Sequence, residues 1–239
     1  MIRHIFLSFL ILCVTKIKSQ EIDGCMYFGR FWSSYRSIDY GTGFRNQQKS
    51  NYNYFPSISV NKYYKNNSSL EFNISFTNYQ QYYSTRKYLA AYSSSNIAGH
   101  LIVRWCFPVI KGDKFEIRLK GGGSLGIAGL YKVEYSVIAF NPSIDSVTRG
   151  TEKKNFTPIF PMLSTGLDIS YKMSKRFKLS LAATYQKGFL RITQYDIYYN
   201  DGSGNNDQRA KQWGTGDFYG MQLGLRYMLR DKEGKKFMK

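Results

Sequence analysis

The 239-residue sequence has few of the residues that build metal centres, disulfide frameworks or catalytic pairs. It contains two histidines and three cysteines, and His4 and Cys13 lie within the first 20 residues. The remainder keeps His100, Cys25 and Cys106, which are too few for a disulfide framework or a clustered zinc site. We therefore expect no metal, no cofactor and no catalytic residue.

A long hydrophobic run is also absent after residue 20. Residues 5–14, IFLSFLILCV, follow a short basic start and are too few for a spanning helix, which needs ~20 apolar residues. Such a start is typical of a secretory signal peptide. The sequence predicts a signal peptide over 1–20, with cleavage near Ser19 or Gln20. The exported remainder, if it crosses a membrane, must form a closed barrel, because lipid leaves open backbone groups unsatisfied.

Acidic residues are scarce, with 16 Asp and Glu against 34 Lys and Arg, which gives a formal net charge of +18. Such a balance suggests nucleic acid or an anionic membrane as partner. Export argues against nucleic acid and favours outer-membrane lipids, including anionic head groups. A plainer interpretation is that many of the charges solvate loops and strand ends.

Segments of roughly ten residues with alternating hydrophobicity follow one another along the exported chain, as in membrane barrels. The clearest, at 218–229, sets Tyr, Met and Leu on one face against Gly, Gln and Arg on the other. The same period occurs at 54–61, 70–77, 100–109, 115–127, 163–171 and 177–186. In segment after segment, one face is nearly free of charged residues. This is expected of a lipid-facing surface, because a Lys or Arg on that face destabilises a barrel by roughly 2–4 kcal/mol at mid-bilayer. Only 25–35 is too mixed for its faces to be assigned.

The connections between these segments alternate between short and long. Tight turns are expected at 65–68, 111–113 and 173–176, and long polar loops at 36–53, 84–98, 129–158 and 190–216. Seven connections join eight strands, so the sequence predicts an all-β fold, an eight-stranded antiparallel up-and-down transmembrane β-barrel over 21–229, with a basic tail at 230–239. Short turns belong on the periplasmic side and long loops outside. A soluble β-sandwich would not explain this alternation.

Aromatic residues make up 17% of the chain, and many fall near the expected strand ends, where interfacial girdles lie. The expected periplasmic girdle comprises Tyr63, Tyr64, Phe115, Tyr171, Phe177 and Tyr227. The expected outer girdle comprises Tyr54, Tyr82, Tyr83, Phe160, Tyr185 and Tyr219.

Charged residues fall on the face opposite the apolar one, and most lie toward the periplasmic turns. They are Glu71, Arg104, Glu116, Arg118, Lys120, Asp168, Lys178 and Arg226. Side chains about fill the interior of an eight-stranded barrel, and buried charges must be paired. The sequence therefore predicts a salt-bridge network that plugs the lumen. A gated ion path lined by the same residues is the alternative.

Two motifs are too incomplete to predict a ligand. Residues 121–126, GGGSLG, match G-x-G-x-x-G, but no helical periodicity follows, and strand glycines serve kinks and close packing. Residues 201–207 alternate oxygen ligands as a Ca²⁺ loop does, but Asn206 stands where that loop has Gly and Gln212 stands where it has its final Glu. Cys25 and Cys106 belong to the first and fourth expected strands, which are not neighbours, so we expect two separate thiols.

Three features of the sequence point to a known family: the signal peptide ending in Ser19-Gln20, the paired hairpins and the closing segment 220–227, GMQLGLRY. In these features the sequence resembles the outer-membrane β-barrel domain common in Bacteroidota, akin to small OmpA/OmpX-type barrels. The resemblance covers nearly the whole exported chain. It implies location in the cell outer membrane and insertion by the barrel-assembly machinery. Family members often end on an aromatic residue just after the last strand, whereas this chain continues into the basic tail.

Three functions are compatible with such a barrel. The first is a non-enzymatic protein that supports the envelope or binds an unknown extracellular ligand through long loops, and the second is a small-solute channel. The third is a lipid-modifying enzyme centred on His100, with a serine at 93–95 as its partner, because barrel enzymes of this size pair His with a nearby Ser. Ile102 stands where the lipid A deacylases of this shape carry the serine.

Overall fold

The computed structural model describes residues 21–40, 44–46, 53–64, 66–85, 91–137, 148–155, 158–199 and 208–230. Its strands are β1 Ile22–Asp39, β2 Phe44–Asn46, β3 Asn53–Tyr63, β4 Ser69–Thr85, β5 Ala91–Lys111, β6 Phe115–Val137, β7 Thr148–Asn155, β8 Ile159–Lys172, β9 Phe177–Gly188, β10 Thr193–Tyr199 and β11 Gln208–Arg230. No helix among these residues is long and apolar enough to cross a membrane. The predicted signal peptide and the 201–207 loop lie outside the described residues, as does the basic tail except for Arg230, which ends β11.

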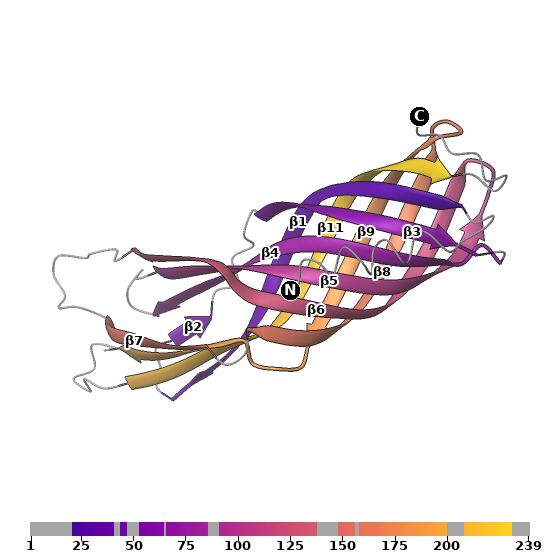
Figure 1. Cartoon of the computed structure of the whole chain (residues 1–239). Coiled ribbons are helices and arrows are strands. Elements are labelled where there is room, and N and C mark those ends of the chain that lie inside the picture. Colours follow the sequence, from indigo (N-terminus) through magenta and orange to yellow (C-terminus); the bar gives the residue numbers. More distant parts are fainter. Residues whose placement is uncertain are drawn as a thin grey trace.

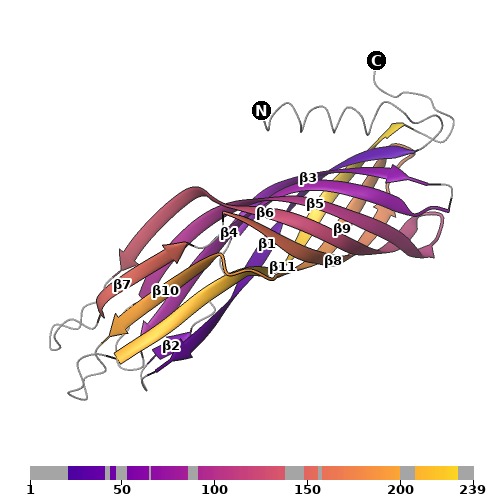
Figure 2. The same ribbon diagram turned by 60° about the horizontal axis from the view of Figure 1, so that its bottom comes forward.

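Eight strands, β1, β3, β4, β5, β6, β8, β9 and β11, form a closed barrel in which each is antiparallel to the next (Figures 1 and 2). Closure comes from β1 and β11, which pair from Ile22 with Arg230 to Asp39 with Ala210. The predicted eight-stranded antiparallel barrel is confirmed.

The outer face of the barrel is apolar and exposed, as a lipid-facing surface must be. Leu163 and Leu223 are each 55% exposed, whereas the next residues, Ser164 and Gly224, face inward. A soluble protein would bury such a belt of large apolar side chains. The predicted faces of the seven alternating segments are confirmed wherever their side chains are described. The faces of β1 are also clear, because Tyr27 is buried in the lumen.

The three short turns are confirmed, and each is closed by backbone hydrogen bonds. Tyr64 N donates to Ser68 O at 2.8 Å, and Gly112 N donates to Phe115 O at 2.7 Å. In the third turn the amide of Met173 donates to the carbonyl oxygen at position 177, at 3.0 Å. Short turns at one end place that end in the periplasm and the opposite, extended end outside the cell.

The described parts of the long connections are largely strand where the sequence predicts polar loops, because strand pairing continues far beyond the barrel (Figure 1). β4 pairs with β5 as far as Tyr83 with Tyr92, and β5 with β6 as far as Ala91 with Val137. β2 adds to β4, β10 adds to β11, and β7 adds to β10 (Figure 2). The expected loops at 84–98 and 190–216 are therefore largely strand. In the outer parts of β10 and β11 the buried face is itself largely polar, as Gln194, Asp196 and Gln212 show, so hydrophobicity need not alternate even where Tyr, Thr and Val favour strands.

Two residues assigned to the aromatic girdles lie inside the barrel instead. Tyr63 is 5% exposed and Phe160 is fully buried. Each shares the inward face of its strand, since Asn61 and Met162, two positions away, are also buried. Phe115, Tyr171, Phe177, Tyr185 and Tyr219 are exposed as predicted.

Candidate functional site

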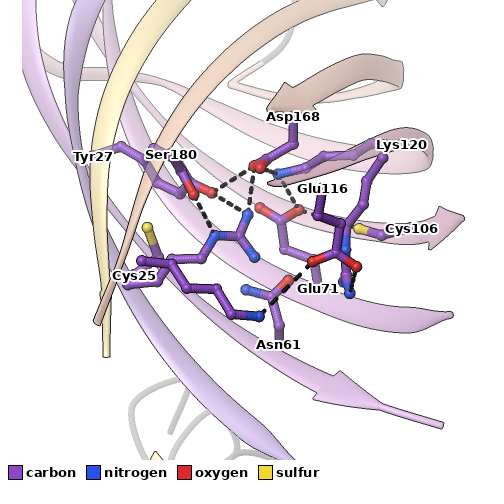
Figure 3. Close-up of polar contacts among 12 residues, drawn as sticks. Cys25, Tyr27, Asn61, Glu71, Cys106, Glu116, Lys120, Asp168 and Ser180 are labelled. Atoms are coloured by element: carbon purple, nitrogen blue, oxygen red, sulfur yellow. Dashed lines mark hydrogen bonds and ion pairs between the residues drawn. The ribbon is translucent and has the colours of Figure 1, made fainter. Parts of the chain in front are cut away.

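Arg226 of β11 lies at the centre of the periplasmic half of the lumen. Its Nε donates to Ser180 Oγ at 2.7 Å, and one terminal nitrogen donates to the Tyr27 hydroxyl at 2.8 Å. The guanidinium also forms ion pairs with Asp168 and, at 3.7 Å, with Asp23. Figure 3 shows Tyr27, Ser180 and Asp168 converging here from different walls of the barrel. One arginine thus ties together β1, β8, β9 and β11.

Lys120 links this centre to a second set of charges. Its Nζ lies 2.8 Å from Asp168 Oδ2 and 2.8 Å from Glu71 Oε2, so one ammonium bridges two carboxylates (Figure 3). Glu71 also pairs with Arg104 at 2.8 Å and accepts a 3.5 Å contact from Cys106 Sγ. Glu71 and Asp168 are fully buried, and fully buried carboxylates are tolerated only with such partners.

A third group of charges lies closer to the periplasm. Arg118 donates to Glu116 at 2.7 Å and to Ser69 Oγ at 2.8 Å, and Lys178 lies 3.8 Å from Glu116. With these, all eight charged residues predicted for the lumen form ion pairs, in two sets: one around Lys120 and Arg226, the other around Glu116. Six strands supply them, so the barrel wall is cross-linked through its interior.

Asp23, Tyr27 and Tyr63 belong to this network and were not predicted from the sequence. Tyr63 donates to Asp23 at 2.5 Å, and the Asn61 amide donates to the same carboxylate at 2.8 Å. The sequence feature that could have revealed Asp23 is the two-residue period of a strand. Asp23 lies two positions before the buried Cys25 and therefore shares its inward face. The mixed pattern of 25–35 concealed that face.

Above the charges, toward the cell exterior, the lumen is closed by an apolar layer. Its members are Phe31, Ala98, Phe160, Met162, Ile192 and Phe218. Phe31 meets Phe218 edge to face with ring centroids 5.4 Å apart. The sequence predicts the charge network but not this apolar layer, which is a finding of the structure.

Inward glycines create the space that these aromatic rings fill. Phe31 lies directly across from Gly220, and Phe160 lies directly across from Gly126. A Cβ at either glycine would overlap the opposing ring. Gly126 ends the 121–126 glycine motif, which lies within a strand paired on both sides, so its role is to accommodate packing and not a nucleotide.

His100 lies beside the apolar layer, on the same strand as residues 93–95. It is 1% exposed, shares a 2.7 Å hydrogen bond with Thr77 and contacts the Phe218 ring with centroids 5.1 Å apart. Residues 93–95 lie at least five positions further along the same strand, roughly 17 Å away at the rise of an extended strand. The backbone of 93–95 is therefore well separated along the strand from that of His100.

No group of three or more metal-ligating side chains occurs among the residues that the structure describes. Cys25 and Cys106 are buried and unbonded to each other, so the prediction of separate thiols is confirmed.

No family model matches the sequence, and no curated protein matches it. Among solved structures, the outer membrane protein OprG from Pseudomonas aeruginosa is similar with a TM-score of 0.51 and 10% identity, over 88% of this chain and 97% of that one. Neisserial surface protein A matches with a TM-score of 0.36 and 10% identity, over 88% and 97%. Ail of Yersinia pestis, in complex with the heparin analogue sucrose octasulfate, matches with a TM-score of 0.38 and 7% identity, over 88% of this chain and 100% of that one.

At this identity the likeness to OprG concerns the fold alone. That fold is the outer-membrane β-barrel, in agreement with the closed sheet and the exposed apolar belt. The protein is a small β-barrel of the outer membrane.

Proposed function

We propose that the protein is a non-enzymatic outer-membrane barrel that keeps its lumen closed and binds at the cell surface through the β-structure it displays outside the membrane. The observation that carries the proposal is the two-level filling of the lumen, with ion pairs around Arg226 below and the Phe31 to Phe218 layer above. Side chains that pack and pair in this way leave little room for a solute path.

The length of the strands supports binding outside the membrane. A membrane-spanning β-strand needs roughly 9–11 residues. β5 has 21 residues and β6 has 23, so about half of each strand extends beyond the bilayer. Extended pairing holds this part in a defined shape, which suits a recognition surface better than loose loops do.

The closed lumen is tested by conductance of the purified full-length protein in planar lipid bilayers. We expect no sustained openings at either polarity. Sustained, ion-selective openings would instead favour the small-solute channel, with the Lys120 and Arg226 region as its gate.

Binding at the surface is tested by removing the outer part of one hairpin. Residues 80–95 are replaced by an Asn-Gly turn joining Tyr79 to Asn96, which are paired partners, so the barrel below keeps its register. Cells displaying either form are applied to arrays of immobilised polysaccharides and proteins. The wild type should be retained on at least one probe and the shortened form released, whereas equal retention of both would contradict a role for this hairpin.

Membership of the barrel domain common in Bacteroidota remains part of the proposal and rests on the closing segment 220–227. Assembly by the barrel-assembly machinery and contact with anionic lipid head groups are proposed with it. A lipid-modifying activity is the remaining alternative. Cells carrying His100→Ala should have an unchanged lipid A profile, and a changed profile would revive the enzyme hypothesis.

A further inference from the structure

The periplasmic mouth of the barrel contains a cavity of about 320 Å³. The β5–β6 turn and the β8–β9 turn supply much of its wall, and Tyr63, Glu116 and Arg118 supply its inner end. These three residues also belong to the charge network, so the cavity begins where the filled part of the lumen ends. We call this cavity the vestibule.

The vestibule differs from the network above it in charge balance. In the buried network, four acids, Asp23, Glu71, Glu116 and Asp168, face four bases, Arg104, Arg118, Lys120 and Arg226. Among the residues that the structure describes, the other charged members of the vestibule wall are five lysines, Lys111, Lys114, Lys172, Lys175 and Lys178, and two acids, Glu21 and Asp113. The vestibule therefore carries an excess of positive charge that the buried network does not neutralise.

Strand pairing forces some of these like charges together. Lys172 and Lys178 are direct partners across β8 and β9, so both side chains leave the same face of the sheet, toward the vestibule. Lys172 N also donates to Lys114 O at 2.7 Å, which brings a third lysine alongside. Like charges directly opposite one another destabilise a sheet. Within the described part of the chain, Lys114 and Lys172 have no ion pair that would relieve this repulsion.

Arg118 adds a donor at the inner end of the vestibule. Its two terminal nitrogens bind Ser69 and Glu116, and its guanidinium lies 4.4 Å from the centre of the Tyr63 ring. Its Nε is buried and has no hydrogen-bond partner among the described residues. A buried N–H group without a partner is unfavourable, so an acceptor oxygen at this end would satisfy it.

We propose that the vestibule is a binding site for a small multivalent phosphate anion, held by Lys172 and Lys178 and oriented by Arg118. The volume lies at the small end of the range for ligand pockets. Phosphate oxygens accept several charge-assisted hydrogen bonds at once, and their charge would remove the repulsion among the lysines. Both phospholipid head groups of the inner leaflet and soluble phosphate compounds of the periplasm present this chemistry.

The first test uses inorganic pyrophosphate and the purified full-length protein in neutral-detergent micelles, followed by titration calorimetry at low ionic strength. The matched variants are Lys172→Gln/Lys178→Gln and, as control, Lys62→Gln. Lys62 is at the same end of the barrel, but its ammonium lies over the Tyr64 ring and outside the vestibule. The double substitution should weaken binding on the order of tenfold or more, because charge-assisted contacts are lost, while the control binds as the wild type does.

A second measurement separates this role from a structural one. Without added anion, the double variant should resist thermal unfolding about as well as the wild type, because losing the 3.8 Å pair between Lys178 and Glu116 is offset by removing the repulsion between Lys172 and Lys178. With pyrophosphate, only the wild type and the Lys62 control should gain stability. A double variant that is less stable without anion would show that the lysines stabilise the fold themselves, and would overturn the proposal.

The source of the phosphate is distinguished in nanodiscs. Protein in phosphatidylcholine discs with and without phosphatidylglycerol is compared by mass spectrometry of retained lipid. Retention of phosphatidylglycerol that is lost in the double variant assigns the vestibule to lipid head groups, whereas pyrophosphate binding alone assigns it to a soluble compound. The proposal is overturned if neither phosphatidylglycerol nor pyrophosphate binds, or if all variants bind equally.

Discussion

Tyr27 of β1 lies directly across from Gly224 of β11, and its ring occupies the space that a side chain at position 224 would need. This placement brings the Tyr27 hydroxyl to 3.0 Å from Asp168 and 2.8 Å from Arg226. The absence of a side chain at Gly224 thus lets the Tyr27 hydroxyl join the ion-pair network. The same arrangement of a large residue opposite glycine recurs higher in the barrel, where it builds the apolar layer.

Replacing Gly224 with Ala should destabilise the barrel by about 1–3 kcal/mol, because the new methyl group would force the buried Tyr27 ring to move. The measurement is urea unfolding in lipid vesicles, followed by the shift between folded and unfolded bands on unheated gels. Gly121→Ala is the matched control, since a Cβ there meets nothing within 4 Å. Equal stability of both variants would show that Tyr27 is not held against Gly224.

Replacing Arg226 with Gln should cost more, about 3–5 kcal/mol, because it leaves buried carboxylates without their cation. Asp168 would keep only Lys120 as a charged partner, at 2.8 Å. The same unfolding assay measures the loss.

The double variant Arg226→Gln/Asp168→Asn provides the control for this prediction. Removing both charges leaves only Asp23, paired with Arg226 at 3.7 Å, without its cation, whereas Arg226→Gln alone also weakens the pairing of Asp168, so the double variant should be more stable than Arg226→Gln alone. Losses that simply add would mean that the two residues do not interact, in conflict with their ion pair.

The closed barrel and most of its charge network could be predicted from the sequence because one physical rule acts along each strand. Lipid excludes charge from alternate positions, so Glu71, Arg104 and Asp168 stand out against their apolar neighbours. The rule fails where both faces are apolar. On β1, Met26 faces lipid while Phe31 faces the lumen, and nothing in the sequence separates them. Only the register shows that Phe31 needs Gly220 opposite.

The structure outside the membrane could not be predicted by the same rule, because no lipid excludes charge from one face there and buried positions such as Asp196 and Gln212 are polar. The stretch 91–96, AYSSSN, has no hydrophobic period and would suit a loop, yet it pairs with β6. The partners come from distant parts of the chain, as when β7 adds to β10. Such pairings depend on the barrel below to bring the strands together.

The two cysteines should not react with a maleimide while the barrel is folded. Cys25 and Cys106 are 2% and 1% exposed, so a reagent cannot reach either thiolate. After heat unfolding, both should be labelled, as counted by intact mass. Ser174→Cys, in the exposed β8–β9 turn, is the positive control and should add one label to the folded protein. Labelling of the wild type without heating would mean that the lumen is accessible.

Asp217 should hold the outer sheet, formed by β7, β10 and the first part of β11, to the barrel at the point where β11 changes partners. β11 pairs with β9 up to Phe218 and with β10 from Gly214 onward. Between them, Asp217 accepts hydrogen bonds from Gly188 N at 2.8 Å and Thr215 Oγ1 at 2.8 Å, and pairs with Lys187 at 2.5 Å.

Replacing Asp217 with Ala removes these contacts, which are worth about 1–3 kcal/mol for a charged acceptor, while the barrel below stays intact. Trypsin added to intact cells should then cut faster after Arg209 and Lys211, which lie in the outer part of β11. Asp113→Ala, in the periplasmic β5–β6 turn, is the control and should leave the rate unchanged. If the variant also lost its folded band on unheated gels, Asp217 would be stabilising the whole barrel, and the outer sheet would not be a separable unit.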